Sequence, residues 1–476
     1  MLFNSLPFLI FFPVVTILYF LLPHKYRWAW LLAASCFFYM FFKPIYIFIL
    51  FFTIIIDYYA GIWIENAEGP KKKQYLAYSL VANIGVLAIF KYYNFINGNI
   101  DGLATLMGFK NPIPYLSILL PVGLSFHTFQ AMSYTIEVYR GNQKAEKHFG
   151  IYSLYVMFYP QLVAGPIERP QNILHQFYEK HQFNFDNLKN GLLLISWGLF
   201  KKVVVADRLS MYVNSTFENL TVYKGFPLLW TMIFFTFQIY CDFSGYSDIA
   251  LGTARVMGFD LMKNFNQPFL AVKLSDYWRR WHISLYSWFN DYLYNPIVIK
   301  YRDYGNWAIV LAIMVTFSLS GLWHGASWTF ILWGTLHGVG LVFEALTKKK
   351  LVKIKKATNV FLFENVTRII TLLFLGFTFF IFRAHHFSEI VYFCKNIYKI
   401  DSNIIGNPIF SKLYFYLNFA FIFIIIISDN FFEKNWVNYM PFKDKINYTF
   451  IAFFFIFLSI YLFGIFEEQS FIYFQF

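Results

Sequence analysis

Apolar segments of nearly membrane length recur from one end of the chain to the other, and they limit the possible folds more than any other feature. A helix needs ~20 predominantly apolar residues to cross the hydrocarbon core of a bilayer. The segments 226–241 and 326–346 approach or reach that length. Because lipid offers no hydrogen-bond partners, such segments must satisfy their backbone groups internally, as helices do. The sequence therefore predicts an all-α polytopic membrane protein with about 11–13 spans plus re-entrant helices.

Composition and charge agree with this class. Hydrophobic residues make up 58% of the 476 and charged residues 14%, whereas soluble domains average ~45–50% and ~25%. The formal net charge of +13 is concentrated in short lysine-rich segments at 71–73, 140–147 and 347–356. Positive charge in loops beside spans is typical of the cytoplasmic face of a membrane protein. We therefore expect membrane lipid as a partner, and no nucleic acid, since no basic face accompanies a soluble fold.

The remaining global features point to a single domain without metal. The three cysteines, Cys36, Cys241 and Cys394, lie far apart in apolar surroundings, so neither a disulfide framework nor a metal site is expected. No internal repeat or low-complexity linker interrupts the chain, and residues 1–476 are interpreted as one transmembrane domain.

One segment, 267–296, is too polar for an ordinary span. It carries His282 among five charged residues (Lys273, Asp276, Arg279, Arg280 and Asp291) and several aromatic residues. One interpretation is a belt at the membrane interface, in which the arginines reach lipid phosphates. The other is a polar helix that lines a substrate tunnel, with Arg279 and Arg280 holding donor phosphates.

The sequence S-G-L-W-H-G-A-S-W places His324 between two apolar segments. The residue has a purely structural interpretation, as a partner for a backbone carbonyl or a serine. Ionisable residues at membrane depth are nevertheless functional candidates, and an imidazole suits proton transfer from an attacking hydroxyl. Gly321 and Gly325 would permit close approach of a helix or ligand, and Trp323 and Trp328 could wall a pocket. His127, which follows P-V-G-L-S-F, is a candidate for the same interior.

Taken together, several stretches resemble the membrane-bound O-acyltransferase (MBOAT) family, in its branch that O-acetylates exported polysaccharides. The similarity covers nearly the whole chain in family order. One local difference is N-D-Y-L-Y-N-P-I-V-I, where R-D-Y-L-Y-I-P-L-G-G is expected. The matching stretches are L-P-V-G-L-S-F-H-T-F-Q (120–130), Y-P-Q-L-V-A-G-P-I (159–167), Y-C-D-F-S-G-Y-S-D-I-A (240–250), W-R-R-W-H-I-S-L (278–285), S-G-L-W-H-G-A (320–326) and the last six residues.

The resemblance implies an MBOAT-like helical bundle around a central tunnel, with core motifs at 119–346 and an aromatic C-terminal tail at 467–476. It implies an acyltransferase of the bacterial cytoplasmic membrane. No cofactor would be bound, and the donor would be acetyl-CoA or a carrier-bound acyl thioester. The acetyl group would reach an alginate- or peptidoglycan-type polysaccharide through a periplasmic or surface-exposed SGNH-type partner.

The resemblance also assigns roles to residues. His324 matches the family's signature histidine and His282 its second polar position, and both are predicted to be catalytic. The predicted substrate contacts are Arg279, Arg280, Trp281, Trp323, Trp328 and His127. Tyr473 is either an aromatic anchor of the tail or a transient acyl acceptor activated by His324; we predict the second.

Other functions remain as alternatives. D-alanyl transfer to teichoic acids uses a related W-H-G motif. A polysaccharide or lipid-linked transporter would place the segment 267–296 along its translocation path, but such transporters usually contain internal repeats. A scaffold that only recruits the outer partner would not need His324.

Overall fold

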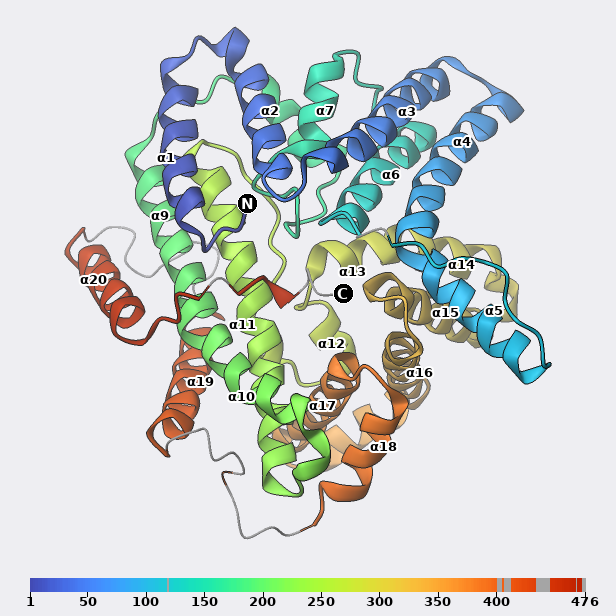
Figure 1. Cartoon of the computed structure of the whole chain (residues 1–476), viewed down its shortest axis with the longest axis vertical. Coiled ribbons are helices and arrows are strands. Elements are labelled where there is room, and N and C mark those ends of the chain that lie inside the picture. Colours follow the sequence, from blue (N-terminus) through green and yellow to red (C-terminus); the bar gives the residue numbers. More distant parts are fainter. Residues whose placement is uncertain (118–119, 400–404, 406–411, 434–445, 468, 473–476) are drawn as a thin grey trace. The chain divides into compact units, whose positions relative to one another are not determined.

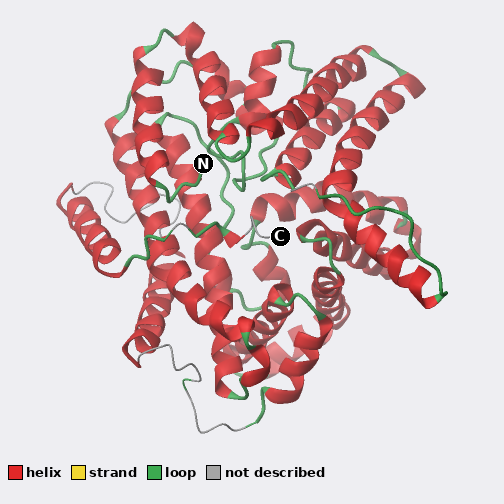
Figure 2. Cartoon of the chain, viewed as in Figure 1, coloured by secondary structure: helices red, strands yellow, loops and turns green. Residues whose placement is uncertain are grey.

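Helices form nearly all of the regular structure of the protein (Figure 2). The computed structural model describes residues 1–117, 120–399, 405, 412–433, 446–467 and 469–472. Within these ranges no strand occurs, and the one isolated β-bridge joins Phe265 to Trp281. The all-α prediction is confirmed.

Seven helical segments in the described part of the chain are long and apolar enough to cross a membrane, which confirms a polytopic membrane protein. Two shorter apolar helices accompany them. The predicted total of about 11–13 also counted shorter segments as spans. One of these forms only the nine-residue helix α7 (Phe149–Met157). The seven segments are Pro44–Asn66, Gly69–Leu106, Phe226–Val256, Asn306–His324, Trp328–Ala357, Val360–Arg383 and Lys412–Asn430.

The chain divides into two compact units, which are described separately. Unit 1 comprises Met1–Ile195 and Ile249–Met262, and unit 2 comprises Ser196–Asp248 and Lys263–Phe476. The expectation of a single domain stays a prediction.

Unit 1 packs helices α3, α4 and α6 against one another (Figure 1). They enclose a buried carboxylate, that of Asp57. Asp57 of α3 accepts hydrogen bonds from Ser79 Oγ at 2.6 Å and from Asn83 Nδ2 at 2.9 and 3.0 Å. Neutral donors thus satisfy a carboxyl group that an apolar core would otherwise exclude. The helices of unit 1 are α1 (Leu6–Leu21), α2 (His24–Met40), α3 (Ile47–Asn66), α4 (Gly69–Leu87), η2 (Ala88–Tyr92), α5 (Tyr93–Leu106), α6 (Leu124–Arg140), α7, α8 (Pro170–Ile173), η3 (His175–Tyr178) and most of α9 (Phe185–Leu199).

Unit 2 begins at Ser196, near the end of α9, continues into a π-helical segment, η4 (Phe200–Ala206), and includes most of the long helix α11 (Phe226–Val256). Lys201 of η4 lies 2.6 Å from Asp248 of α11 and donates to Ser244 at 2.9 Å. The further helices of unit 2 are α10 (Asp207–Glu218), α12 (Leu274–Trp278), α13 (Ile283–Phe289), η7 (Asn290–Tyr294), α14 (Asn295–Lys300), α15 (Asn306–His324), α16 (Trp328–Ala357), α17 (Val360–Arg383), α18 (Phe387–Asn396), α19 (Lys412–Glu433) and α20 (Ile446–Phe463).

Candidate active site

The helices α15 and α16 touch backbone to backbone, and this contact fixes the last turn of α15. A Cβ atom added to Gly321 would lie 2.2 Å from the carbonyl oxygen of Phe330, and one added to Gly334 would lie 2.1 Å from that of Phe317. Only glycine permits so close an approach of two helices. The geometry holds His324, the final residue of α15, in one position relative to α16.

His324 is buried in an aromatic cage. Its ring centroid lies 5.0 Å from that of Trp323, 5.1 Å from Trp333 and 5.4 Å from Phe382. All three rings are steeply inclined to the imidazole, at 74–89°. Aromatic walls of this kind exclude bulk water from a reactive group.

His282 lies in a strained turn between α12 and α13. Its backbone has φ 45° and ψ 54°, in the left-handed region that non-glycine residues seldom adopt. Asn264 braces the turn, since its carbonyl oxygen accepts the Ile283 N–H at 2.9 Å and its side-chain oxygen accepts Ser284 Oγ–H at 2.6 Å. The strain is therefore held by specific hydrogen bonds.

The imidazole of His282 is 1% exposed and packs 4.7 Å from the ring of Phe243. Burial lowers its pKa to about 3, because an apolar environment disfavours the charged form. The ring is therefore neutral at pH 7. The indole of Trp323 lies 6.3 Å from His282 and 5.0 Å from His324. The structure thus brings the two predicted histidines to the same tryptophan.

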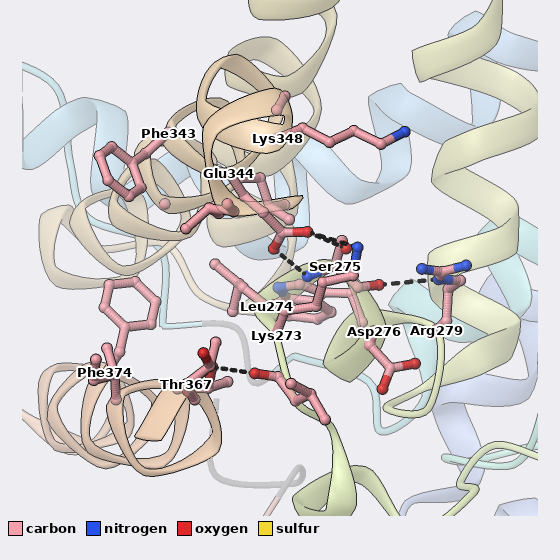
Figure 3. A pocket seen from close by; sticks show the side chains of 18 of the residues that line it. Lys273, Leu274, Ser275, Asp276, Arg279, Phe343, Glu344, Lys348, Thr367 and Phe374 are labelled. Atoms are coloured by element: carbon pink, nitrogen blue, oxygen red, sulfur yellow. Dashed lines mark hydrogen bonds and ion pairs between the residues drawn. The ribbon is translucent and has the colours of Figure 1, made fainter. Parts of the chain in front are cut away.

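A cavity of about 1200 Å³ opens beside His282, between α12, α13, α15, α16 and α17. His282, Trp278 and Ser320 are among its lining residues, whereas His324 is not. Most of the lining is apolar, with charged side chains contributed by α12 and the residues that flank it, by α16 and by α17. Figure 3 shows those near α12 and on α16. The cavity is large enough for a ligand with a long apolar arm and a charged head. The charged lining residues are Lys273, Asp276, Arg279, Glu344, Lys348, Lys355 and Glu364.

The charged wall of the cavity is organised around Glu344. Its carboxylate accepts hydrogen bonds from the backbone N–H and the hydroxyl of Ser275, and it lies 3.4 Å from Lys273 Nζ. These contacts tie α12 to α16 (Figure 3). Arg279 donates to the Ser275 carbonyl at 3.2 Å but is itself exposed. In Figure 3 the charged ends of Arg279 and Lys348 both lie in the right half of the view.

The other predicted contact residues lie elsewhere. Arg280 pairs with Asp276 at 3.3 Å, and Trp281 is buried against Phe265 at 5.0 Å between ring centroids. Neither Arg280 nor Trp281 lines the cavity. Trp328, at the start of α16, is 54% exposed.

His127 belongs to unit 1, where its buried ring lies 6.4 Å from that of Tyr39 and neither ring nitrogen has a hydrogen-bond partner among the described residues. Tyr473 lies outside the described residues. Across the residues that the structure describes, no three or more His, Cys, Asp or Glu side chains gather where they could hold a metal ion.

Sequence reasoning missed two features of unit 2. The Trp278 indole, which lines the cavity, donates to His337 Nδ1 at 3.3 Å, so His337 orients a cavity wall. The second feature is a set of charged residues on η4 and α11, including Lys201 and Asp248. The sequence could have indicated these residues, because they are ionisable side chains within or beside apolar segments.

Comparison with known proteins identifies the family. The family model of the membrane-bound O-acyltransferases matches residues 147–380. The chain is 36% identical over 351 residues to the probable alginate O-acetylase AlgI of Azotobacter vinelandii, covering 72% of this chain and 68% of the relative. It is 34% identical to the peptidoglycan O-acetyltransferase of Helicobacter pylori, covering 66% of this chain and 63% of the relative.

A more distant similarity, 30% identity over 293 residues, links it to the teichoic acid D-alanyltransferase of Streptococcus thermophilus. That match covers 55% of this chain and 69% of the relative. The multi-pass membrane architecture, the matched family region and these relatives agree with the resemblance that the motifs indicated. The chain belongs to the membrane-bound O-acyltransferase family, and it is an O-acyltransferase.

Proposed function

We propose that the protein uses a cytoplasmic acyl thioester to O-acetylate an exported polysaccharide of the alginate or peptidoglycan type. The observation that carries the proposal is the cavity, which joins a charged wall to a buried neutral imidazole, that of His282. The glycan class rests on the relatives, which are named for alginate and peptidoglycan acetylation.

The donor occupies the cavity. Its phosphates or other anionic groups pair with Arg279, Lys273 and Lys348, since guanidinium and ammonium groups form strong charge-assisted hydrogen bonds with phosphate. The apolar lining takes the thioester arm. Acetyl-CoA and a carrier-bound acyl group share this chemistry.

The reaction is acyl transfer from sulfur to oxygen. An acceptor hydroxyl attacks the thioester carbonyl while the imidazole of His324 accepts the hydroxyl proton. Collapse of the tetrahedral intermediate breaks the C–S bond, and the departing thiolate takes the proton from the imidazolium. His282 assists from the donor side, and Trp323, which touches both rings, excludes water that would hydrolyse the thioester.

The acceptor step uses the C-terminal tail. Tyr473 takes the acetyl group as a phenyl ester, which is energetic enough to pass it to a serine of an SGNH-type partner outside the membrane. The phenol needs a base within hydrogen-bond reach, because its ordinary pKa of ~10 makes it a weak nucleophile.

The test is transfer of radiolabelled acetyl groups to envelope glycan in cells that express the protein or its His324→Ala variant. We expect loss of ~10²–10⁴-fold in the variant, the usual contribution of a general base, with an unchanged amount of protein in the membrane. Near-normal acetylation in the variant would refute the catalytic assignment.

D-alanyl transfer is the second candidate, because the similarity to the teichoic acid enzyme extends over 55% of the chain. Supplying labelled acetate and labelled D-alanine in parallel separates the two. If only labelled D-alanine is incorporated, and if this incorporation requires His324, the proposed reaction is D-alanyl transfer and not acetyl transfer.

A further inference from the structure

Unit 2 contains a second group of buried ionisable side chains, in which one lysine lies between two aspartates. Lys202 Nζ lies 2.8 Å from Asp207 Oδ1 and 2.7 Å from Asp242 Oδ1. Each of the three side chains is at most 4% exposed, and none lines the cavity. Buried ion pairs are a weak argument for stability, because desolvation of the charges offsets most of their attraction. The cluster therefore requires another explanation.

The C-terminal segment completes the hydrogen bonding of this cluster. The backbone N–H of Ile472 donates to Asp242 Oδ2 at 2.7 Å, so both carboxylate oxygens of Asp242 have partners. The carbonyl oxygen of Ser470 lies 3.4 Å from Lys202 Nζ and supplies a third partner to the ammonium group. Without this segment, two buried charged groups would each lose a hydrogen bond.

Side chains of the segment fit the same place. Phe471 is 1% exposed, and its ring packs perpendicular to that of Tyr246 with 4.8 Å between centroids. Lys202 Nζ lies 4.6 Å from the Phe471 centroid. Gln469 accepts a hydrogen bond from Ser210 Oγ at 2.8 Å. The segment 469–472 therefore meets a built surface contributed by η4, α10 and α11.

We infer that Lys202, Asp207 and Asp242 form a docking site for the segment 469–472, and that Lys202 and Asp242 are positioning residues for Tyr473. This inference rests on the acyl relay proposed above. An aromatic anchor would need only the contact of Phe471. The Asp242 carboxylate instead accepts a hydrogen bond from the backbone N–H of Ile472. This contact fixes the main chain directly before Tyr473, and it does not depend on which side chain residue 472 carries.

The experiment compares Ile472→Pro with Ile472→Ala. Both variants lose the isoleucine side chain, but only proline removes the N–H that Asp242 accepts. Each is combined with a photo-reactive benzoylphenylalanine at position 471, whose cross-link to the α11 peptide containing Tyr246 reports docking. Glycan acetylation is measured without the photo-reactive residue.

We expect Ile472→Pro to lose at least ~10-fold in both cross-link yield and acetylation, the scale of a hydrogen bond to a buried charge. Ile472→Ala should keep most of both. Equal yields and equal activities in the two variants would overturn the inference. So would a lost cross-link with normal acetylation, because docking would then have no role in transfer.

A second variant tests the cluster itself. Replacing a buried ion group by residues of similar volume is often neutral for folding, so Lys202→Met, Asp207→Asn and Asp242→Leu are combined. We expect the protein to fold, with cross-link and acetylation reduced as in Ile472→Pro; a retained cross-link would exclude the cluster as the docking site. Tyr473→Phe separates the two proposals: if it stays active while Ile472→Pro is inactive, docking stands and the tyrosine relay fails.

Discussion

Unit 2 holds buried ionisable groups in two contrasting environments. The imidazole of His324 is surrounded by the rings of Trp323, Trp333 and Phe382, whereas the ammonium of Lys202 lies between two carboxylates. Aromatic rings enclose a side chain and exclude water from it. Ion pairs hold charge and geometry constant. The first environment suits chemistry and the second suits the fixing of a chain segment, and the two should respond differently to substitution.

The largest effect should follow from His324→Phe. Another aromatic ring fits the cage, so thermal unfolding in detergent should change little, while acetyl transfer falls ~10²–10⁴-fold for want of a base. Trp333→Phe, which alters the cage but keeps the imidazole, is the matched control and should lose much less activity. If the His324→Phe protein is stable and transfers acetyl groups at the normal rate, the aromatic cage has no catalytic role and the proposed contrast between the two environments fails.

Lys202→Met should show the opposite pattern, with stability lost first. The variant leaves Asp207 and Asp242 buried without their cation, which typically costs ~3–5 kcal/mol. The unfolding midpoint of the purified protein should drop sharply. Adding Asp207→Asn and Asp242→Asn should restore most of the midpoint; if the single variant is as stable as the parent, the charges are not held as the structure indicates.

Gly334→Ala should affect stability and activity together. The new methyl group meets the backbone oxygen of Phe317 at 2.1 Å, so α15 and α16 must separate, and overpacking of this kind costs ~1–3 kcal/mol. Because His324 lies on the last turn of α15, acetyl transfer should fall as well. Gly338→Ala is the control, since the nearest atom to its methyl group is the sulfur of the flexible Met314 side chain, at 3.1 Å, and the next ones lie at ordinary contact distances of 3.5 and 3.6 Å. Equal losses at both positions would contradict a special role for the Gly334 contact.

The smallest effect concerns donor binding. Arg279 lines the cavity and is exposed, so Arg279→Ala should raise the KM for the thioester donor a few-fold, roughly the scale of an exposed ion pair, with little change in kcat. Arg280 faces Asp276 instead, and Arg280→Ala should leave the KM unchanged. If Arg280→Ala raised the KM more than Arg279→Ala did, Arg280 and not Arg279 would be the residue that contacts the donor phosphates.

The helices were predictable from hydropathy, but their lengths were not. The apolar segment 226–241 ends where polar residues begin, yet α11 continues to Val256, because Lys201 and Lys202 pair with Asp248 and Asp242 along it. Similarly, α16 runs past 346 through the lysine-rich stretch to Ala357, since lysine is a good helix former. A hydropathy average over a short stretch of sequence cannot detect an ion-pair partner that lies forty residues away, as Asp242 does from Lys202.

The motifs predicted which site residues would lie near one another, and their catalytic roles stay a prediction. His282 and His324 both lie beside Trp323, with 6.3 and 5.0 Å between ring centroids. Arg279 and Arg280 are neighbours in the same motif, and sequence could not separate them, because the path of the chain after α12 decides which side chain meets the cavity. The hydrogen bond from Trp278 to His337 joins residues 59 positions apart and leaves no local sequence pattern.

The glycine contact between α15 and α16 also restricts how the enzyme can diversify. No single substitution at Gly321 or Gly334 can widen the space there, because any added atom collides with the backbone of the facing helix. Neither glycine lines the cavity, whereas α12 and α13 contribute large side chains such as Trp278 and Phe289 to it, and these can be trimmed one at a time. Acceptance of bulkier acyl groups should therefore evolve, or be engineered, by shortening side chains that line the cavity, and not at the glycine contact.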